Sequence, residues 1–217
     1  YRNFNLEDFQ RRGLADTQRR AEKIKNSFSS KISLLDIGCG YGFFVKALND
    51  EGFKAQGLEI SKERRAIAQK LIDDPVLSFK IAGPNKTKNI LDVITLFHVL
   101  EHIKDPIKLC VDLKTYLKPN GTLIIEVPNA NDYLLKINKN YRDFFWQKAH
   151  ISYFTPETIK KVLEKSGYGN VKIIGVQRYS LENSLNWIFR GKPQLKSPVY
   201  QTTGFLLLLE NFYKNLL

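Results

Sequence analysis

Cysteine is scarce in this sequence, and long hydrophobic runs are absent. Two cysteines in 217 residues, Cys39 and Cys110, cannot form the disulfide framework of a small secreted domain. The longest apolar run, at residues 205–209, is far shorter than the roughly 18–20 residues of a membrane span, and no signal peptide is recognisable. These absences predict a cytoplasmic protein without a membrane span. Hydrophobic residues still make up 43% of the chain, which is enough to bury a full core.

Acidic residues are outnumbered, and the basic excess is unevenly distributed. The chain has 34 Lys and Arg against 22 Asp and Glu, which gives a formal net charge of +12. The middle of the chain, residues 32–128, is nearly balanced at +1, whereas residues 1–31 carry +4 and residues 129–217 carry +7. Such an asymmetry is typical of proteins with an acidic partner. A basic but merely solvated surface is the alternative.

Apolar stretches typical of strands alternate with helical stretches along much of the chain. We expect strands near residues 32–37, 54–60, 77–83, 91–97, 122–128 and 170–177. We expect helices near residues 6–28, 41–52, 62–72, 105–121, 155–167 and 205–217, of which the last could instead begin as a strand. Asp105 and Thr155, each followed by a proline, are typical helix caps. The alternation predicts an α/β fold with a parallel sheet and right-handed crossovers.

A glycine-rich turn, "DIGCGYG" at residues 36–42, follows the first expected strand. Glycines at this point let the backbone turn sharply and let a ligand approach the free N–H groups of the next helix. Glu59 ends the second expected strand, 21 residues after Gly38. An acidic residue in that place can accept hydrogen bonds from ribose hydroxyls. The pair predicts a nucleoside-binding site, and a solvated glutamate at a strand end is the alternative.

The residue sequence of the glycine turn distinguishes between nucleoside cofactors. A dinucleotide fingerprint reads G-x-G-x-x-G, and its third glycine allows the helix to pack closely on the strand. Here Phe43 stands at that third position, and Asp36 would place negative charge beside a pyrophosphate. A cofactor that carries an ammonium and a sulfonium would be attracted by the same charge. S-adenosylmethionine carries both, so we expect it as the cofactor and S-adenosylhomocysteine as the product.

Four stretches, "LLDIGCGYGFF", "GLEIS", "DVITLFHVLEHIKDP" and "LKPNGTLIIEVPN", resemble in order and spacing the motifs of class I S-adenosylmethionine-dependent methyltransferases. The nearer resemblance is to the branch of ubiquinone-pathway O-methyltransferases and of methyltransferases from glycan and natural-product clusters. It implies a Rossmann-like, doubly wound, mostly parallel sheet with helices on both faces. A cap or lid would come from the N-terminal helix and from insertions after strands five and six. The expected segments are an N-terminal helical cap (1–30), a cofactor-binding core (31–178, with a lid at 129–154) and a C-terminal insertion with an amphipathic helix (179–217).

The resemblance also implies a role for each residue of the cofactor site. Residues around the glycine turn would line the methionine end of the cofactor, Glu59 would bind the ribose, and Ile60 would pack on the adenine. Phe97 and His98, at the end of the fourth strand, would lie beside the sulfonium, and residues 83–85 would border the adenine edge. The expected cofactor-binding residues are Asp36, Gly38, Cys39, Gly40, Glu59, Ile60, Phe97 and His98.

The stretch "FHVLEH" contains His98-x-x-Glu101-His102, which is the spacing of a family of zinc proteases. A protease would need these residues on one long helix, but here they follow a strand and stop before the helix that starts at Asp105. We therefore expect a short strand-to-helix turn and no metal. The ubiquinone-pathway enzymes carry Glu in place of His98 and are associated with a divalent metal, which leaves metal assistance as the alternative. Mutual capping of Glu101 and His102 is the purely structural interpretation.

His98, His150 and His102 are the candidate catalytic residues. Methyl transfer to a hydroxyl needs a base, and His98 is the best placed by motif. His150 lies in an aromatic segment, 141–154, that could form the floor of an acceptor pocket or pack as a lid. The +12 charge and the basic flanks favour an acidic acceptor, and Arg142, Lys148, Arg11, Arg12 and Arg190 are the basic residues that we expect to face it.

Three functions compete at this point. The leading one is O-methylation of a small-molecule or sugar acceptor, and the basic flanks favour an anionic one. The second is methylation of RNA, which the basic charge suggests, although no RNA-binding module and no N-P-P-Y-type motif is recognisable, so nucleic acid is not the expected partner. The third is a non-catalytic S-adenosylmethionine-binding protein. The sequence leaves the acceptor and the oligomeric state open.

Overall fold

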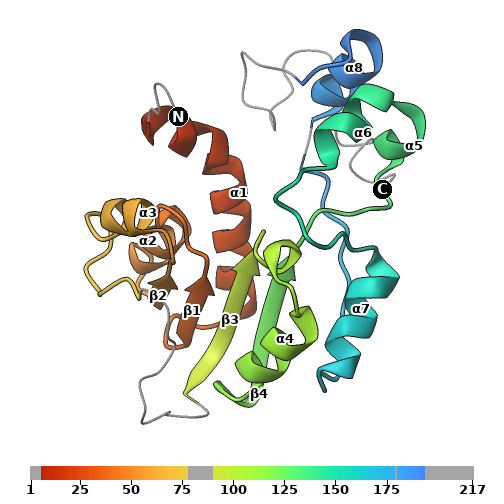
Figure 1. Ribbon diagram of the computed structural model, residues 1–217. Helices are drawn as coiled ribbons and strands as arrows, with labels where there is room; N and C mark the ends of the chain where they lie inside the picture. Colours follow the sequence, from red (N-terminus) through yellow and green to blue (C-terminus); the bar gives the residue numbers. More distant parts are fainter. Residues whose placement is uncertain (1–5, 78–89, 179, 194–217) are drawn as a thin grey trace. The chain divides into compact units, whose positions relative to one another are not determined.

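The computed structural model describes residues 6–77, 90–178 and 180–193 (Figure 1). The chain divides into two compact units. Thr17–Pro128 and Ile151–Val171 form the first, which we term the sheet unit. Tyr1–Asp16, Asn129–His150 and Lys172–Leu217 form the second, which we term the helical unit. The division into an N-terminal cap, a core and a C-terminal insertion follows other boundaries and stays a prediction.

The sheet unit contains four parallel strands in the order β2-β1-β3-β4 (Figure 1). They are β1 (Ser33–Ile37), β2 (Lys54–Leu58), β3 (Leu91–Phe97) and β4 (Leu117–Glu126). The order places β1 and β3 in the centre of the sheet. Parallel strands need crossover connections between them, and these usually contain helices. All four lie where the sequence predicts strands, so the prediction of a parallel α/β sheet is confirmed.

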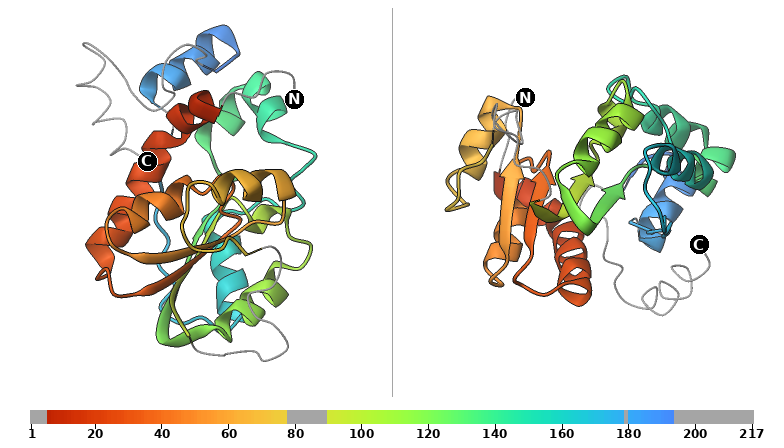
Figure 2. Two further views of the ribbon diagram at one scale, coloured as in Figure 1. Left: turned by 90° about the vertical axis from the view of Figure 1, so that its left-hand side faces the viewer. Right: turned by 90° about the horizontal axis from the view of Figure 1, so that it is seen from below.

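Alternate residues of the central strands enter two separate cores, because successive side chains of a strand point to opposite faces. Leu34 and Val93 pack with buried residues of α1 (Leu6–Ser27), α2 (Phe43–Asn49) and α3 (Lys62–Ala68). Leu35, Ile94 and Leu96 pack with buried residues of α4 (Pro106–Lys114) and α7 (Pro156–Lys165). Helices α2 and α4 thus cover opposite faces of the sheet (Figure 2), which confirms the doubly wound architecture.

Helix starts in the sheet unit follow the predicted capping chemistry. The Asp105 carboxylate accepts a hydrogen bond from the backbone N–H of Lys108 at 2.8 Å and caps α4, with Pro106 in the first turn. Thr155 caps α7, where its hydroxyl and that of Thr158 form a reciprocal capping box. Each cap satisfies a backbone donor that the helix cannot satisfy itself. These two helices therefore start where the sequence predicts.

The connection from α4 to β4 differs from the prediction. The helix ends at Lys114, and β4 begins as early as Leu117. The register with β3 then jumps, because Leu91 is paired with Leu117 but Val93 is paired with Thr122. The additional residues form an irregularity in the strand, with Asn120 in the left-handed region at φ 65°. The proline-asparagine-glycine stretch is thus a bulge within the strand rather than the end of the helix.

Of the remaining predicted elements, one strand is wrong and two elements lie wholly or partly outside the described residues. Residues 170–177 are not a strand, and Ile173 and Ile174 are exposed. A strand needs a neighbour to satisfy its backbone groups, and no strand within the described ranges pairs with this segment. Of the predicted strand 77–83, only Leu77 is described, and it forms a parallel bridge with Leu58. Residues 78–83 and the predicted element at 205–217 lie outside the described residues.

The helical unit contains α5 (Tyr133–Ile137), α6 (Lys139–Phe145) and α8 (Leu181–Arg190). Its small core is formed by Leu134, Leu135, Tyr141 and Trp187, and the rings of Tyr141 and Trp187 meet edge to face at 5.2 Å. The Asn138 side chain donates to the Trp187 carbonyl at 2.6 Å. Most of the predicted lid segment thus folds as part of a helical core. Among the described residues, no helix is long and apolar enough to cross a membrane.

Candidate active site

The glycine turn after β1 is formed by residues in the left-handed backbone region, where Gly38 has φ 75° and Gly40 has φ 59°. The two glycines meet different surroundings. A Cβ atom on Gly38 would lie 2.5 Å from Cγ2 of Val99, so this position needs glycine for packing as well as for its conformation. A Cβ atom on Gly40 would meet no atom within 4 Å. The backbone at Gly40 is therefore open to close approach by a ligand.

Glu59 follows β2 directly and closes the glycine turn from the other side. The residue is 2% exposed, and its carboxylate accepts hydrogen bonds from the N–H of Gly40 at 3.0 Å and from the N–H of Ser61 at 2.8 Å. Arg64 lies 3.5 Å from the same carboxylate. The next residue, Ile60, is 66% exposed despite being apolar. A fixed carboxylate beside an uncovered apolar side chain fits a nucleoside, since the first can accept ribose hydroxyls and the second can pack on a base.

Asp36 is buried near the end of β1. The Thr95 hydroxyl of β3 donates to its carboxyl group at 2.6 Å. Burial raises the pKa of Asp36 to about 7, and the Thr95 hydrogen bond and the charge of Arg20 only partly oppose this rise. Burial likewise raises the pKa of the neighbouring Cys39 thiol to about 12, so this cysteine stays protonated. The turn thus contains one carboxyl group that changes its charge near neutral pH.

Phe97 ends β3, and His98 follows it directly. The Phe97 ring meets the edge of Phe44 at 5.0 Å, and the Arg20 guanidinium of α1 lies 4.4 Å from its centroid. His98 is one of three non-glycine residues described with a positive φ, 57°. The backbone N–H of His98 donates to the carbonyl of Glu126 at 2.9 Å. A residue in this strained region persists only when its surroundings hold it there, and such residues cluster at functional sites.

The imidazole of His98 lies between two carboxylates. Its Nδ1 is 3.2 Å from Oε1 of Glu101, and its Nε2 is 3.3 Å from Oε1 of Glu126. Glu101 is 1% exposed, and its second oxygen is buried with no hydrogen-bond partner among the residues described. A buried polar atom in that condition costs free energy, which is typical of a binding site. Glu101 therefore pairs with His98, and the mutual capping of Glu101 and His102 stays a prediction.

Glu126 is a site residue that the sequence analysis missed. It ends β4, opposite Phe97 in the register, and its carboxylate accepts hydrogen bonds from Arg19 at 2.7 Å and from Arg20 at 2.6 Å. Burial acts to raise the pKa of Glu126, but hydrogen bonds from His98, Arg20 and Arg19 outweigh it and hold the pKa far below its usual range. The signal was its place at the carboxyl end of a parallel strand, where ligands bind in such sheets.

The other predicted catalytic residues have different settings. His102 is exposed and ends a single 3-10 turn, Leu100–His102, which confirms the short strand-to-helix turn in place of a protease helix. His150 belongs to the helical unit, where its backbone N–H donates to the Gln147 carbonyl. The predicted adenine-edge residues, 83–85, lie outside the described residues. The roles of His102 and His150 stay predictions.

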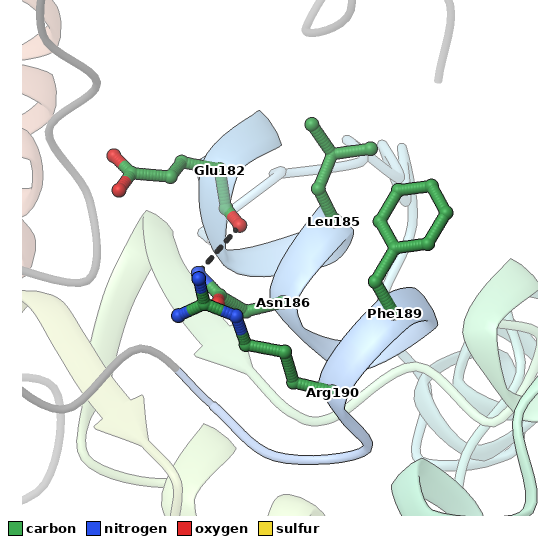
Figure 3. Close-up of a pocket in the computed structure, with 5 residues that line it drawn as sticks. All are labelled: Glu182, Leu185, Asn186, Phe189 and Arg190. Atoms are coloured by element: carbon green, nitrogen blue, oxygen red, sulfur yellow. Dashed lines mark hydrogen bonds between the residues drawn. The ribbon is translucent and has the colours of Figure 1, made fainter.

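All five basic residues expected to face an acceptor, Arg142, Lys148, Arg11, Arg12 and Arg190, belong to the helical unit. Arg142 donates to the carbonyl of Leu135 at 2.9 Å, so it serves as a cap for the end of α5. Arg190 ends α8 and lines a shallow pocket together with Glu182, Leu185, Asn186 and Phe189 (Figure 3). Within that pocket, the Asn186 side chain donates to the Glu182 carbonyl at 3.0 Å. The side chains of Arg11 and Arg12 lie outside the described part of the chain.

A parallel sheet with a glycine turn after its first strand and an acidic residue after its second defines a Rossmann-like fold for a nucleoside cofactor. Residues 7–173 match the family of methyltransferase domains. The chain belongs to this family, and the match confirms the prediction of a class I S-adenosylmethionine-dependent methyltransferase.

Curated relatives share part of their length with this chain. The ubiquinone biosynthesis O-methyltransferase of Actinobacillus pleuropneumoniae serotype 5b is 30% identical over 118 residues, which is 50% of this chain and 50% of that protein. The tRNA U34 carboxymethyltransferase of Hydrogenovibrio crunogenus is 25% identical over 174 residues, 71% of this chain and 51% of that protein. The chain thus spans about half the length of these two relatives.

Solved structures show the same fold at low sequence identity. A SAM-dependent methyltransferase from Archaeoglobus fulgidus superposes with a TM-score of 0.62 at 18% identity, covering 98% of this chain and 93% of that one. At this identity the likeness concerns the fold alone.

Proposed function

We propose that this protein transfers a methyl group from S-adenosylmethionine to a hydroxyl group of a small-molecule or sugar acceptor. The observation that carries the proposal is the convergence of three features at the carboxyl ends of adjacent strands. The glycine turn follows β1, Glu59 follows β2 and His98 follows β3, and β1 pairs with both of the others. Ligands of open parallel sheets bind at this edge.

The residues of the sheet unit suit the cofactor in size, polarity and charge. Gly40 leaves space beside the backbone, Glu59 offers carboxylate oxygens to the ribose, and Ile60 offers an apolar surface to the adenine. Asp36, when ionised, attracts the positive charges of the methionine part. When bound, S-adenosylmethionine supplies a methyl group that its sulfonium makes electrophilic. Positioning the acceptor and removing its proton is left to the protein.

His98 is the residue that we assign as general base. Its Nε2 would take the proton of the acceptor hydroxyl as the acceptor oxygen forms its bond to the methyl carbon. Glu101 would keep the proton on Nδ1, because its oxygen lies 3.2 Å from that nitrogen and an ionised carboxylate only accepts. It would also stabilise the positive imidazolium that results. General-base assistance of this kind typically contributes about 10²- to 10⁴-fold to a rate.

The ubiquinone-pathway relatives support O-methylation, and the basic flanks support an acceptor with a phosphate or carboxylate group. RNA methylation is the second candidate, because one relative is named a tRNA carboxymethyltransferase and the chain carries a net charge of +12. The two candidates differ in their dependence on salt. Binding to RNA should weaken steeply as salt rises, because many phosphate contacts release counterions together. Binding of a small anion should weaken only slightly.

The test begins with the cofactor. Calorimetric titration should show one site for S-adenosylmethionine and one for S-adenosylhomocysteine, and mass spectrometry of the purified protein should reveal a co-purified S-adenosyl compound. Transfer of a labelled methyl group should then be measured on a panel of phenols, sugar nucleotides and total RNA, with His98→Asn as the comparison. Failure to bind either S-adenosyl compound would refute the proposed function. Binding without transfer to any acceptor would favour a non-catalytic role.

A further inference from the structure

The carboxylate of Glu126, at the end of β4, contacts both helix α1 and His98, the proposed base. Arg20 holds it with a two-pronged contact, Nη2 to Oε1 at 2.6 Å and Nε to Oε2 at 3.3 Å. Arg19 adds Nη2 to Oε2 at 2.7 Å, and Nε2 of His98 lies 3.3 Å from Oε1. The side chains of Arg20 and Glu126 are each 15% exposed. An ionised carboxylate can accept about four hydrogen bonds, so the three arginine contacts leave one position, which Nε2 of His98 can fill as a donor once it carries a proton.

The contacts differ in strength. The two shortest arginine contacts have the length of strong charge-assisted hydrogen bonds, whereas the distance to His98 is longer by more than half an ångström. The His98 contact is thus the one that can be exchanged. When a hydroxyl group approaches Nε2, the arginines of α1 keep Glu126 in place beside the ring. The carboxylate then remains close to the nitrogen that gains the proton.

We propose that Glu126 is a positioning residue for His98: its carboxylate, which Arg19 and Arg20 fix to α1, accepts a hydrogen bond from Nε2 once that nitrogen has taken up the proton. Together with Glu101 on Nδ1, it holds the ring and stabilises it in its charged form. This inference rests on the proposed function, because it concerns the residue assigned there as base. It also gives α1 a part in the chemistry, since two consecutive arginines of that helix hold the carboxylate.

The charged groups around the ring set the expected effects. Glu101 of the turn after β3 and Glu126 of β4 face the imidazole directly, Arg19 and Arg20 of α1 face Glu126, and Asp36 of β1 lies near Arg20. Glu126→Gln removes a negative charge from Nε2 and disfavours the imidazolium. Arg20→Gln removes a positive charge and leaves Glu126 with fewer competing donors. This substitution should therefore favour the imidazolium form of His98. The two substitutions should therefore act in opposite directions.

The measurement needs no acceptor. The chain contains three histidines, so two-dimensional ¹H–¹⁵N spectra can resolve every imidazole, and the signal missing in His98→Asn identifies His98. We expect the titration midpoint of His98 to fall by about half to one pH unit in Glu126→Gln and to rise by a similar amount in Arg20→Gln, since a neighbouring charge typically shifts a pKa by this much or more. Circular dichroism would establish that each variant is folded.

A matched control lies at the other end of the same strands. Asp92 of β3 is paired with Lys118 of β4 at 2.8 Å, so Asp92→Asn removes a carboxylate and an ion pair but should leave His98 unchanged. Midpoint changes below about 0.2 pH units in both variants, or equal changes in the same direction, would overturn the inference. If Glu126→Gln does not fold, Arg20→Gln alone carries the test through its upward shift, and no shift would overturn it.

Titration with S-adenosylhomocysteine separates this inference from the proposed function. The wild type and the control Asp92→Asn should bind it with affinities within about twofold, because Asp92 lies at the start of β3, away from the residues assigned to the cofactor. A wild-type protein that binds no S-adenosyl compound would refute the proposed function whatever His98 does. Normal binding together with an insensitive His98 would refute the positioning role alone.

Discussion

Cofactor binding should depend on the ionisation of Asp36. Burial raises the pKa of this carboxyl group to about 7, against the hydrogen bond from Thr95 and the charge of Arg20. A protonated Asp36 offers no charge to a cationic ligand, whereas an ionised one attracts it. The positive methionine part of the cofactor should therefore bind more tightly at higher pH, and binding near neutral pH should release a proton from the protein.

The magnitude follows from that pKa. If only the ionised form binds, the apparent dissociation constant is multiplied by one plus the ratio of protonated to ionised carboxyl groups. With a pKa of about 7, the affinity at pH 6 should be about tenfold weaker than at pH 8, which corresponds to about 1.4 kcal/mol. In Asp36→Asn, affinity should be lower throughout and should show only the pH dependence of the ligand's own groups.

Isothermal titration calorimetry is the assay, run at pH 6, 7 and 8 in buffers with different ionisation enthalpies. The dependence of the observed heat on the buffer gives the number of protons released. We expect a release near pH 6 that is absent in Asp36→Asn. A wild-type protein with the same pH dependence as Asp36→Asn would refute the reasoning, because Asp36 would then be ionised, or protonated, over the whole range.

The raised pKa has a second consequence, for stability. The native state keeps a proton on Asp36 that the unfolded chain, with a pKa near 3.8, releases. The native state therefore loses stability as pH rises from about 4 to about 7, by at most about 4 kcal/mol from this group. Chemical denaturation of wild type and Asp36→Asn over this range should show a difference in stability that grows with pH, in favour of the variant. A constant difference would contradict the shifted pKa.

The remaining predictions concern other features of the site. Glu59→Gln should weaken S-adenosylhomocysteine binding by about 1.5–3 kcal/mol for each charge-assisted hydrogen bond lost to the ribose, and unchanged affinity in calorimetry would remove Glu59 from the cofactor site. Gly38→Ala should lower the melting temperature more than Gly40→Ala, because only the first would bring a Cβ atom to 2.5 Å from a neighbouring side chain; equal losses would contradict this difference in packing. Treatment with a chelator should leave methyl transfer unchanged, and restoration of a lost activity by a divalent ion would favour metal assistance. Apparent affinity for an anionic acceptor should fall as salt rises while cofactor affinity stays nearly constant, and Lys148→Ala with Arg190→Ala should reduce that dependence; a flat response would assign the basic flanks to solvation.

Much of the sheet unit could be predicted from local sequence. The apolar runs of the four described strands, the caps Asp105 and Thr155 and the glycine turn each carry their own signal within a few residues. The segment at 170–177 shows the limit of such signals. Its alternating apolar residues suit a strand, but a strand also needs a partner along its edge, and the residues on either side of it cannot specify one.

The site shows the same division between local and distant determinants. The residue order by itself determined the parallel sheet, the glycine turn, the acidic residue after β2 and the histidine after β3, because all of these depend on neighbours in the chain. Only the tertiary structure placed Glu126 against His98 and Arg20 against Glu126, although Arg20 and Glu126 are 106 positions apart. Burial, which raises the pKa of Asp36, likewise depends on how the strands and helices pack. Charges interact through space, so their partners are decided by the fold and not by adjacency in the sequence.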